Sequence, residues 1–409
     1  MRILYVILCG LFLAGCSQTG GNSAVPAGLP NGGASTVNAA LGSGPSIARQ
    51  PSGNHGYKLL YGFTGSPDGG FPGTGLLTVN GTLYGTTEYG GVASGSGGLG
   101  TIFTVSTSGQ ESVLYSFGSS KTDGTNPYGS LVEVNGEIYG TTYSGGKGNG
   151  TVFKMNTSGK EVVLYRFKGA PDGAQPEAGL IAVNGLLYGT TYSGGANNSG
   201  TVFEVTTSGQ EQVLHSFGSS PADGTQPYAG LVAVKGTLYG TTFLGGTTGV
   251  GTAFKVSRSG KEVVLHTFGT SAKDGAQPYG GLIALNGQLY GTTINGGKNS
   301  SGTVFQMSTS GTERVIHNFK GSPDGAQPFA GLIALNGQLY GTTYNGGNLS
   351  AGTAFKLSTS GTERVLYSFA GSPDGGNPHA SLIALNGELY GTTISGGVAG
   401  YGTVFTVSP

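Results

Sequence analysis

The chain has 409 residues, of which 83 are Gly and only 9% are charged, and its formal net charge is zero. A surface this weakly charged argues against nucleic acid as a partner, because phosphate binding requires clustered Lys and Arg. Hydrophobic residues make up 36% of the chain, which favours a packed fold over disorder.

The N-terminal segment has the layout of an export signal. Arg2 precedes an apolar run that is too short to span a bilayer comfortably, and small residues follow it. The letters LAGC at 13–16 match the bacterial lipobox, whose Cys becomes the lipidated first residue after cleavage. The sequence therefore predicts a signal peptide over 1–15 and lipid attachment at Cys16, which anchors the protein to a membrane. The alternative is an ordinary cleaved signal that happens to contain this Cys.

Ser17 follows the lipobox Cys and does not resemble an inner-membrane retention signal. The expected location is the bacterial cell envelope, at the outer membrane. Residues 16–56 are rich in Gly, Ser, Ala, Asn and Pro and predict a flexible tether. Because Cys9 leaves with the signal and Cys16 takes the lipid, the mature domain is expected to have no free thiol. This excludes disulfides, a Cys nucleophile and Cys-ligated zinc.

Residues 57–409 form a tandem array. An LYGTT-like core recurs about every 50 residues, a period typical of repeat folds. Each unit contains four short runs with strand character, which in the fifth unit are 282–287, 288–293, 302–307 and 313–319. Asn286-Gly287 separates the first two runs, and Asn-Gly suits a tight hairpin because both residues tolerate positive φ. The equivalent core tyrosines are Tyr84, Tyr139, Tyr188, Tyr239, Tyr290, Tyr340 and Tyr390.

Four strands per unit at this period predict an all-β fold, a single seven-bladed β-propeller of four-stranded antiparallel blades. A β-solenoid is the rival fold, but its coils are usually shorter and lack paired hairpins. The array begins at 57–63 with a run that aligns with the fourth strand of the other units, and it ends with a third strand at 402–407. We therefore expect the strand at 57–63 to complete the last blade and close the ring, which removes exposed sheet edges.

The unit D-G-x-x-P-x-x-G-L-I-x-x-N-G-x-L-Y-G-T-T resembles the GloVer tandem repeat of bacterial "choice-of-anchor" surface proteins. The resemblance covers residues 57–409. It implies a surface location and an anchor, here the N-terminal lipid. It implies no established biochemical activity and no particular ligand.

If strands run outward from the central channel, the loops after the second and fourth strands share one face. A ring of aspartates lies there, each followed by Gly. Asp-Gly is turn chemistry, so these carboxylates are interpreted as caps of their own loops. One Asp per blade also spreads the acids too far apart to share one calcium ion. The aspartates are Asp68, Asp123, Asp172, Asp223, Asp274, Asp324 and Asp374.

The residue after the repeated Pro on this face is expected to approach the channel mouth. Aromatic side chains at a mouth could stack on sugar rings or cap an apolar ligand, but they could also pack between blades as wedges. Glu and His replace the aromatic in two units without a packing motive. In chain order this position holds Gly73, Tyr128, Glu177, Tyr228, Tyr279, Phe329 and His379.

Two further acids depart from the repeat. Glu88 follows GTT where other units have mainly aromatic or aliphatic residues, and Glu133 stands where other units have Ala or Thr. Such acids are either solvated or functional, because an unpaired buried carboxylate is costly. Glu88, Glu133 and Glu177 could lie on one side of the ring, and a pair of carboxylates could hydrolyse a glycoside.

The histidines of the fourth strands are interpreted as packing residues. His215, His266 and His317 occupy the position that Tyr61, Tyr115, Tyr165 and Tyr367 fill in other units. The sequence contains no metalloprotease, P-loop or nucleophile-elbow motif. We therefore predict no cofactor, no metal site and no catalytic residue.

Three functions remain open, because propellers host many unrelated activities. The leading hypothesis is a non-enzymatic binding or assembly module, with a carbohydrate or protein partner at the variable loop face. One alternative is an enzyme that acts on glycans through acids at the channel mouth. The other is a structural protein for surface display. A monomer is expected, attached to a membrane by its lipid.

Overall fold

The computed structural model describes residues 56–92 and 98–409. The predicted signal peptide, Cys16 and all but the final residue of the predicted tether lie outside the described residues. The residues that are described form strands, turns and loops and no helix, so they contain no helix that is long and apolar enough to cross a membrane.

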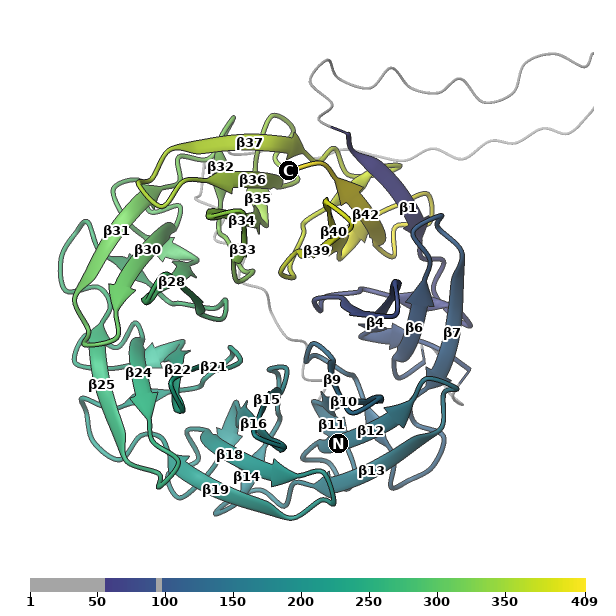
Figure 1. Ribbon diagram of the computed structural model, residues 1–409, viewed down its shortest axis with the longest axis horizontal. Coiled ribbons are helices and arrows are strands. Elements are labelled where there is room, and N and C mark those ends of the chain that lie inside the picture. Colours follow the sequence, from purple (N-terminus) through teal and green to yellow (C-terminus); the bar gives the residue numbers. More distant parts are fainter. Residues whose placement is uncertain (1–55, 93–97) are drawn as a thin grey trace, which may run out of the picture. The chain divides into compact units, whose positions relative to one another are not determined.

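Seven four-stranded antiparallel sheets stand around a ring, with the first strand of each sheet innermost and the fourth outermost (Figure 1). The predicted seven-bladed propeller is confirmed. Blades 1 to 4 consist of β3 (Leu77–Val79), β4 (Thr82–Thr87), β6 (Thr101–Val105) and β7 (Glu111–Ser116); β9 (Val132–Val134), β10 (Glu137–Thr142), β12 (Thr151–Asn156) and β13 (Glu161–Arg166); β15 (Ile181–Val183), β16 (Leu186–Thr191), β18 (Thr201–Thr206) and β19 (Glu211–Ser216); and β21 (Val232–Val234), β22 (Thr237–Thr242), β24 (Thr252–Val256) and β25 (Glu262–Thr267).

Blades 5 to 7 follow the same order. They consist of β27 (Ile283–Leu285), β28 (Gln288–Thr293), β30 (Thr303–Ser308) and β31 (Glu313–Asn318); β33 (Ile333–Leu335), β34 (Gln338–Thr343), β36 (Thr353–Leu357) and β37 (Glu363–Ser368); and β39 (Ile383–Leu385), β40 (Glu388–Thr393), β42 (Thr403–Val407) and β1 (Lys58–Gly62).

The ring closes through its first strand, as the sequence predicts. β1 pairs antiparallel with β42, with Lys58 opposite Thr406 and Gly62 opposite Thr403. The pairing shifts register by one residue partway along the strand, as it does between the third and fourth strands of the other blades. Blade 7 therefore has the same construction as the others, although it is built from both ends of the array.

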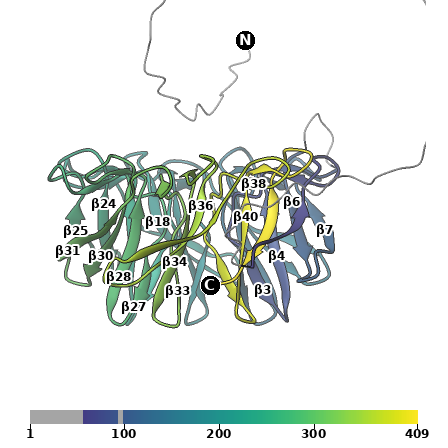
Figure 2. The same ribbon diagram turned by 90° about the horizontal axis from the view of Figure 1, so that it is seen from above.

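The turns of the inner hairpins share one face, here called the hairpin face, which lies at the bottom of Figure 2. Asn286 has a φ of 52° and Gly287 a φ of 76°, which is the doubly left-handed turn that Asn-Gly favours. In blade 4 the Asn is replaced by Lys235, which adopts a φ of 50° all the same. The local geometry therefore persists where its preferred residue is missing.

Aromatic contacts join each blade to the next. Phe319, after the fourth strand of blade 5, packs edge-to-face on Phe355 in the third strand of blade 6, with ring centroids 5.3 Å apart. Both side chains are fully buried. An edge-to-face pair contributes about 0.5–1.5 kcal/mol beyond its buried area. Equivalent pairs join the other blades: Phe63–Phe103, Phe117–Phe153, Phe167–Phe203, Phe217–Phe254, Phe268–Phe305 and Phe369–Phe405.

The repeated letters of the second strand reflect this packing. A Cβ atom at Gly291 would lie 2.6 Å from the ring of Phe305 and 2.8 Å from Leu282, so only Gly leaves room for the core phenylalanine. In the same strand the hydroxyl of Thr293 is 2.8 Å from that of Thr303 on the paired strand, and both side chains are buried. The GTT core thus satisfies a geometric requirement that every blade shares.

The opposite face, here called the loop face, carries seven short sheets that the sequence pattern did not predict. The residues after each Asp pair with the residues after each GTT in a short two-stranded sheet. In blade 5, β26 (Gly275–Ala276) pairs with β29 (Asn295–Gly296). The other pairs are β2 (Gly69–Gly70) with β5 (Tyr89–Gly90), β8 (Gly124–Thr125) with β11 (Ser144–Gly145), β14 (Gly173–Ala174) with β17 (Ser193–Gly194), β20 (Gly224–Thr225) with β23 (Leu244–Gly245), β32 (Gly325–Ala326) with β35 (Asn345–Gly346), and β38 (Gly375–Gly376) with β41 (Ser395–Gly396).

Candidate functional site at the centre of the loop face

The residue after the repeated Pro is held in place by the residue before that Pro. In blade 5, Gln277 has a left-handed φ of 58°. Its N–H donates to the carbonyl of Val250 in blade 4, at 2.8 Å, and its own carbonyl accepts from the N–H of Ile294, at 3.1 Å. A non-Gly residue in this conformation is uncommon, and it recurs at this position in all seven blades. The backbone conformation and hydrogen bonds of Gln277 therefore fix the position from which the Tyr279 side chain projects.

Four of these side chains form an aromatic arc, defined here as Tyr228, Tyr279, Phe329 and His379. Tyr228 stacks on Tyr279 with centroids 4.7 Å apart, and Phe329 stacks on His379 at 5.0 Å. Tyr279 also meets Phe329 edge-on at 5.1 Å. Tyr279 and His379 come from blades 5 and 7, yet their rings are 5.4 Å apart, so the arc lies close to the ring axis. All four side chains are half-buried.

A second tier of side chains supports the arc from the residue that follows each GTT. Phe243 packs edge-on against Tyr228 at 5.1 Å, and Tyr344 packs on Phe329 at 5.0 Å. Tyr192 adds a further contact with Tyr228 at 4.9 Å. The arc is therefore packed against a second row of rings, while part of each of its own rings stays accessible.

Acids occupy another part of the same centre. Tyr128 of blade 2 donates a hydrogen bond from its hydroxyl to the carboxylate of Glu88 of blade 1. Burial raises the pKa of Glu88, although this hydrogen bond works against the rise. Burial, followed by the negative charge of Glu88, raises the pKa of Glu177 to about 8. Glu177 is therefore largely protonated at neutral pH and can donate a hydrogen bond.

Two of the residues that the sequence singled out, Glu133 and Gly73, contribute no side chain to this centre. Glu133 lies in β9, is exposed, and accepts a hydrogen bond from the backbone N–H of Gly136 in its own hairpin turn. The contacts of Glu133 are therefore with the hairpin face, and the structure does not bring it together with Glu88 and Glu177. Gly73 in blade 1 contributes no side chain and lies beside His379 and Ile394.

Burial lowers the pKa of His379, which therefore stays neutral at pH 7.

The centre thus combines apolar aromatic surface with two acids, Glu88 and Glu177, of which Glu177 holds a proton at neutral pH. Aromatic faces attract the C–H groups of a sugar ring or an apolar ligand, and a protonated carboxyl together with a carboxylate offers both a donor and an acceptor. The sequence indicated which positions would converge. It did not indicate that Tyr128 would bind Glu88, because the two residues come from different blades.

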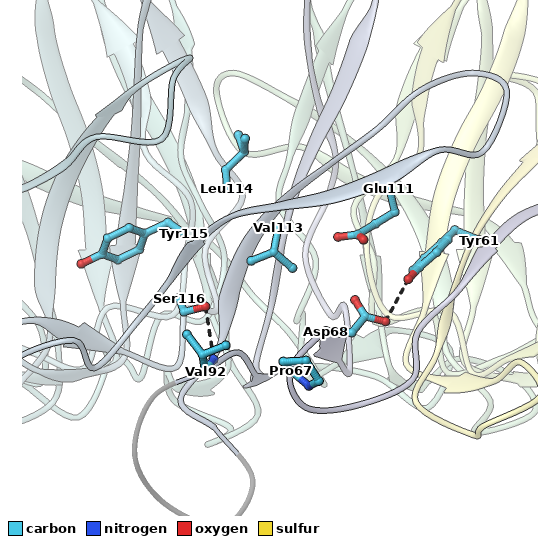
Figure 3. A pocket seen from close by; sticks show the side chains of 9 residues that line it. All are labelled: Tyr61, Pro67, Asp68, Val92, Glu111, Val113, Leu114, Tyr115 and Ser116. Carbon is cyan, nitrogen blue, oxygen red and sulfur yellow. Dashed lines mark hydrogen bonds between the residues drawn. The ribbon is translucent and has the colours of Figure 1, made fainter.

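The outer rim of the ring holds surface cavities. One of about 500 Å³ is lined by Tyr61, Asp68 and Glu111 together with apolar side chains (Figure 3). Tyr61 donates a hydrogen bond to Asp68 at 3.0 Å, and Glu111 points toward the same space. Asp68 also accepts from the backbone N–H of Thr64 at 2.9 Å, so it caps its own loop. The sequence predicted that the aspartates cap their own loops, but it did not predict that Glu111 lies beside Asp68.

The geometry defines a seven-bladed propeller with a diverged centre on its loop face. The family model of the Gloeobacter/Verrucomicrobia repeat matches residues 35–233 and 219–405, and the chain belongs to this repeat family. No curated protein matches the chain.

The chain is similar to solved structures of low sequence identity. A puromycin hydrolase is 11% identical over 81% of this chain and 51% of its own length, with a TM-score of 0.52. A gluconolactonase from Xanthomonas campestris is 12% identical over 63% of this chain and 79% of its own, with a TM-score of 0.40. At such identities a likeness concerns the fold alone.

Proposed function

We propose that this propeller is a non-enzymatic binding module that holds a carbohydrate at the centre of its loop face. The observation that carries the proposal is the half-buried arc of Tyr228, Tyr279, Phe329 and His379, which converges from four blades. Aromatic rings that already pack on one another lose little conformational freedom when a ligand stacks on them, so ordering these side chains costs little of the binding free energy.

The acids complete the proposed site. Glu88 is engaged by Tyr128 and offers a carboxylate oxygen, while Glu177 offers a proton. A sugar presents both donors and acceptors in its hydroxyl groups. The combination of a stacking surface with both kinds of hydrogen-bonding group therefore suits a glycan better than a purely apolar ligand.

The proposed location is the cell envelope, with a lipid on Cys16 as the anchor. This part of the proposal rests on the sequence motif at 13–16. Fractionation of cells that produce the Cys16→Ser variant tests it, because the variant should leave the membrane fraction. A variant that stays with the membranes would refute lipid attachment at this residue.

The binding proposal is tested with the full-length protein and a panel of soluble glycans, including fragments of envelope polysaccharides. Tyr228→Ala should weaken glycan binding about tenfold or more, since it removes one stacking face. Leu349→Ala is the matched control, because this side chain is exposed and lines the cavity beside His317 at the outer rim, away from the arc, so its loss should leave affinity unchanged. Equal binding by Tyr228→Ala and the wild type would overturn the proposal.

A thermal melt of the same variants separates ligand binding from a structural role. The proposal requires Tyr228→Ala to keep most of its thermal stability while it loses affinity. A large fall in the melting temperature, with residual affinity in proportion to the folded fraction, would make the aromatic residues wedges between blades and would favour the structural-display alternative.

The glycan-active enzyme remains the second candidate, because Glu177 holds a proton near neutral pH and Glu88 shares its surroundings. This is the arrangement of a general acid beside a second carboxyl group. Glu177→Gln distinguishes the two candidates. It should abolish any glycan hydrolysis while preserving binding, and a wild type that releases no sugar from any bound glycan rules out the enzyme.

A further inference from the structure

Each interface between blades carries three polar side chains at the outer rim, here called a rim triad. One blade supplies a Tyr or His from its fourth strand, the loop that follows supplies an Asp, and the fourth strand of the next blade supplies a Glu. Three consecutive triads contain His: His215–Asp223–Glu262, His266–Asp274–Glu313 and His317–Asp324–Glu363. Three contain Tyr: Tyr61–Asp68–Glu111, Tyr115–Asp123–Glu161 and Tyr165–Asp172–Glu211. At the seventh interface, Tyr57 replaces the Glu beside Tyr367 and Asp374.

The His triads have the spacing of a metal site. In each of them one potential ligand atom from every residue lies within 4.8 Å of the other two. The Nε2–Oδ2 distances are 3.7 Å for His215–Asp223, 3.3 Å for His266–Asp274 and 3.5 Å for His317–Asp324. Ligand atoms that each lie about 2.1 Å from a tetrahedral zinc ion are about 3.4 Å from one another. Small side-chain movements therefore suffice to bring the three residues onto one ion.

In the His215 triad, buried atoms without a hydrogen-bond partner point to a missing ligand. The side chain of Asp223 is 4% exposed, and its Oδ1 has no hydrogen-bond partner. Nε2 of His215 and Oε1 of Glu262 are also buried and unpartnered. Leaving a buried polar atom without a partner costs about 1–3 kcal/mol. Oδ2 of Asp223, the oxygen 3.7 Å from Nε2 of His215, accepts from both the N–H and the hydroxyl of Ser219, at 2.9 Å each. These bonds orient the carboxylate and its free Oδ1 as an outer shell orients a metal ligand.

The Tyr triads provide an internal comparison. They contain the same pair of acids. Buried acid oxygens without a hydrogen-bond partner occur there too, on Asp68, Asp123, Glu111, Glu161 and Glu211. In each Tyr triad, however, the phenol hydroxyl donates a hydrogen bond to the Asp, at 2.8 Å in the case of Tyr165 and Asp172. A His in the same place carries a ring nitrogen that can donate to the Asp, as Nε2 of His266 can to Oδ1 of Asp274 at 3.4 Å, or can act instead as a lone-pair ligand. The carboxylate pair is thus common to both kinds of triad, and His alone adds the third ligand.

We propose that the three His triads bind divalent transition-metal ions of the zinc class, one ion at each triad. One imidazole nitrogen and two carboxylate oxygens suit zinc and its neighbours, whereas calcium takes oxygen ligands only. The His317 triad lines a cavity of about 810 Å³, together with Lys320 and Tyr367. An ion held there by three side chains keeps a coordination position open to water, as catalytic zinc sites do.

The experiment measures metal stoichiometry on the full-length chain. Cys9 and Cys16 are replaced by Ser in every sample, so that neither thiol competes for the metal. Calorimetric titration with ZnCl₂, followed by elemental analysis after dialysis, should find three zinc ions per chain in this background. His215→Tyr should reduce the number to two, and the triple variant His215→Tyr, His266→Tyr, His317→Tyr should reduce it to none.

Each variant is matched to the protein's own sequence, because Tyr already occupies the equivalent position in the four other blades. The triple variant should therefore melt near the parent in the absence of metal. Only the parent should gain thermal stability as ZnCl₂ is added, since an ion that binds the folded state alone stabilises it.

A gain-of-site variant keeps the test independent of any loss of folding. Tyr165–Lys168–Asp172 has the same residue spacing as His317–Lys320–Asp324, and Glu211 stands where Glu363 stands. Tyr165→His should therefore raise the stoichiometry from three to four. The proposal is overturned if the triple variant binds as much zinc as the parent. It is equally overturned if the parent binds no zinc, which would leave each His as a packing residue beside its two acids.

Discussion

The two faces of this propeller are built by the same seven repeats but differ in what the repeats keep constant. On the hairpin face, six of the seven inner turns are Asn-Gly, and even Lys235 adopts the same left-handed backbone. At the centre of the loop face the backbone also recurs, since the residue before Pro is left-handed in every blade, but the side chain after Pro is Gly, Tyr, Glu, Phe or His. The scaffold is thus constant on both faces, and the chemistry varies on one.

This difference shows what identity between repeats means. A position repeats when its neighbours in every blade leave only one residue that fits, as Gly291 does under Phe305. A position diverges when the backbone holds it without help from its side chain. Divergent positions on a constant backbone can take up chemistry at little cost to the fold, so they are the places to look for function.

The largest expected effect comes from Gly291, and a second glycine of the same thirteen-residue stretch, GLIALNGQLYGTT at 281–293, provides its control. Gly291→Ala places a Cβ atom 2.6 Å from Phe305 and should destabilise the fold by about 1–3 kcal/mol through overpacking. Gly281→Ala is the control, because its Cβ atom would meet only the carbonyl oxygen of Gly230 at an ordinary 3.6 Å. Thermal melts of both variants measure the effect. Equal melting temperatures would show that repetition at Gly291 does not reflect packing.

An intermediate effect on thermal stability is expected at Glu161, a repeated acid whose burial destabilises the folded protein when the carboxyl group is ionised. Burial, followed by the charge of Asp123, raises the pKa of Glu161 to about 7. The unfolded value is about 4.3, so the folded state binds the proton more tightly, and stability falls as the pH rises from about 4 to about 7. Glu161→Gln removes this loss.

The melting temperature of Glu161→Gln should therefore exceed that of the wild type at pH 8, and the difference should shrink at pH 5. Gln has nearly the same shape as Glu, so packing contributes equally at both pH values. A difference that stays constant between pH 5 and pH 8 would mean that the pKa of this carboxyl group is not raised in the folded state. The repetition of the acid in six units would then have another cause.

The smallest effect is expected where the hairpin face departs from its own pattern. Lys235 holds a φ of 50° in the position that Asn occupies in the other six inner turns. Asn tolerates this conformation better, so Lys235→Asn should stabilise the protein by about 0.5–1 kcal/mol. The melting temperature should rise by about 1–3 °C. A fall would mean that the Lys side chain makes a stabilising contact that outweighs the backbone preference.

The fold could be predicted from the sequence because the strands and turns of a blade come from one short stretch of chain. The period of the repeat, the Asn-Gly turns and the fourth-strand run at 57–63 predicted seven blades and the closing strand, and β1 pairs with β42 as expected. The short sheets of the loop face were missed. They join Gly-rich segments such as Gly275–Ala276 and Asn295–Gly296, which have no strand propensity of their own.

The candidate sites were only partly predictable, because they form between blades. The sequence identified Tyr279, Phe329 and His379 as one class of position, and the structure shows their rings in contact. It gave no way to tell that Glu313 would lie beside His266, because these residues occupy the fourth strands of neighbouring blades. A fourth strand read alone shows His exchanging with Tyr, which is typical of packing. Read across the interface, the same His has two acids beside it.

The pairing of β1 with β42 also fixes the order of events when the chain is made. β1 leaves the ribosome before any other described strand, and its partner β42 is the last to follow. Six blades can assemble from segments that are neighbours in the sequence, but the seventh needs both ends of the array. Until then β1 is a strand with an open edge, and Tyr57 is separated from Tyr367, on which it stacks at 3.7 Å in the finished ring. The completion of the ring therefore reports that the whole array has been translated.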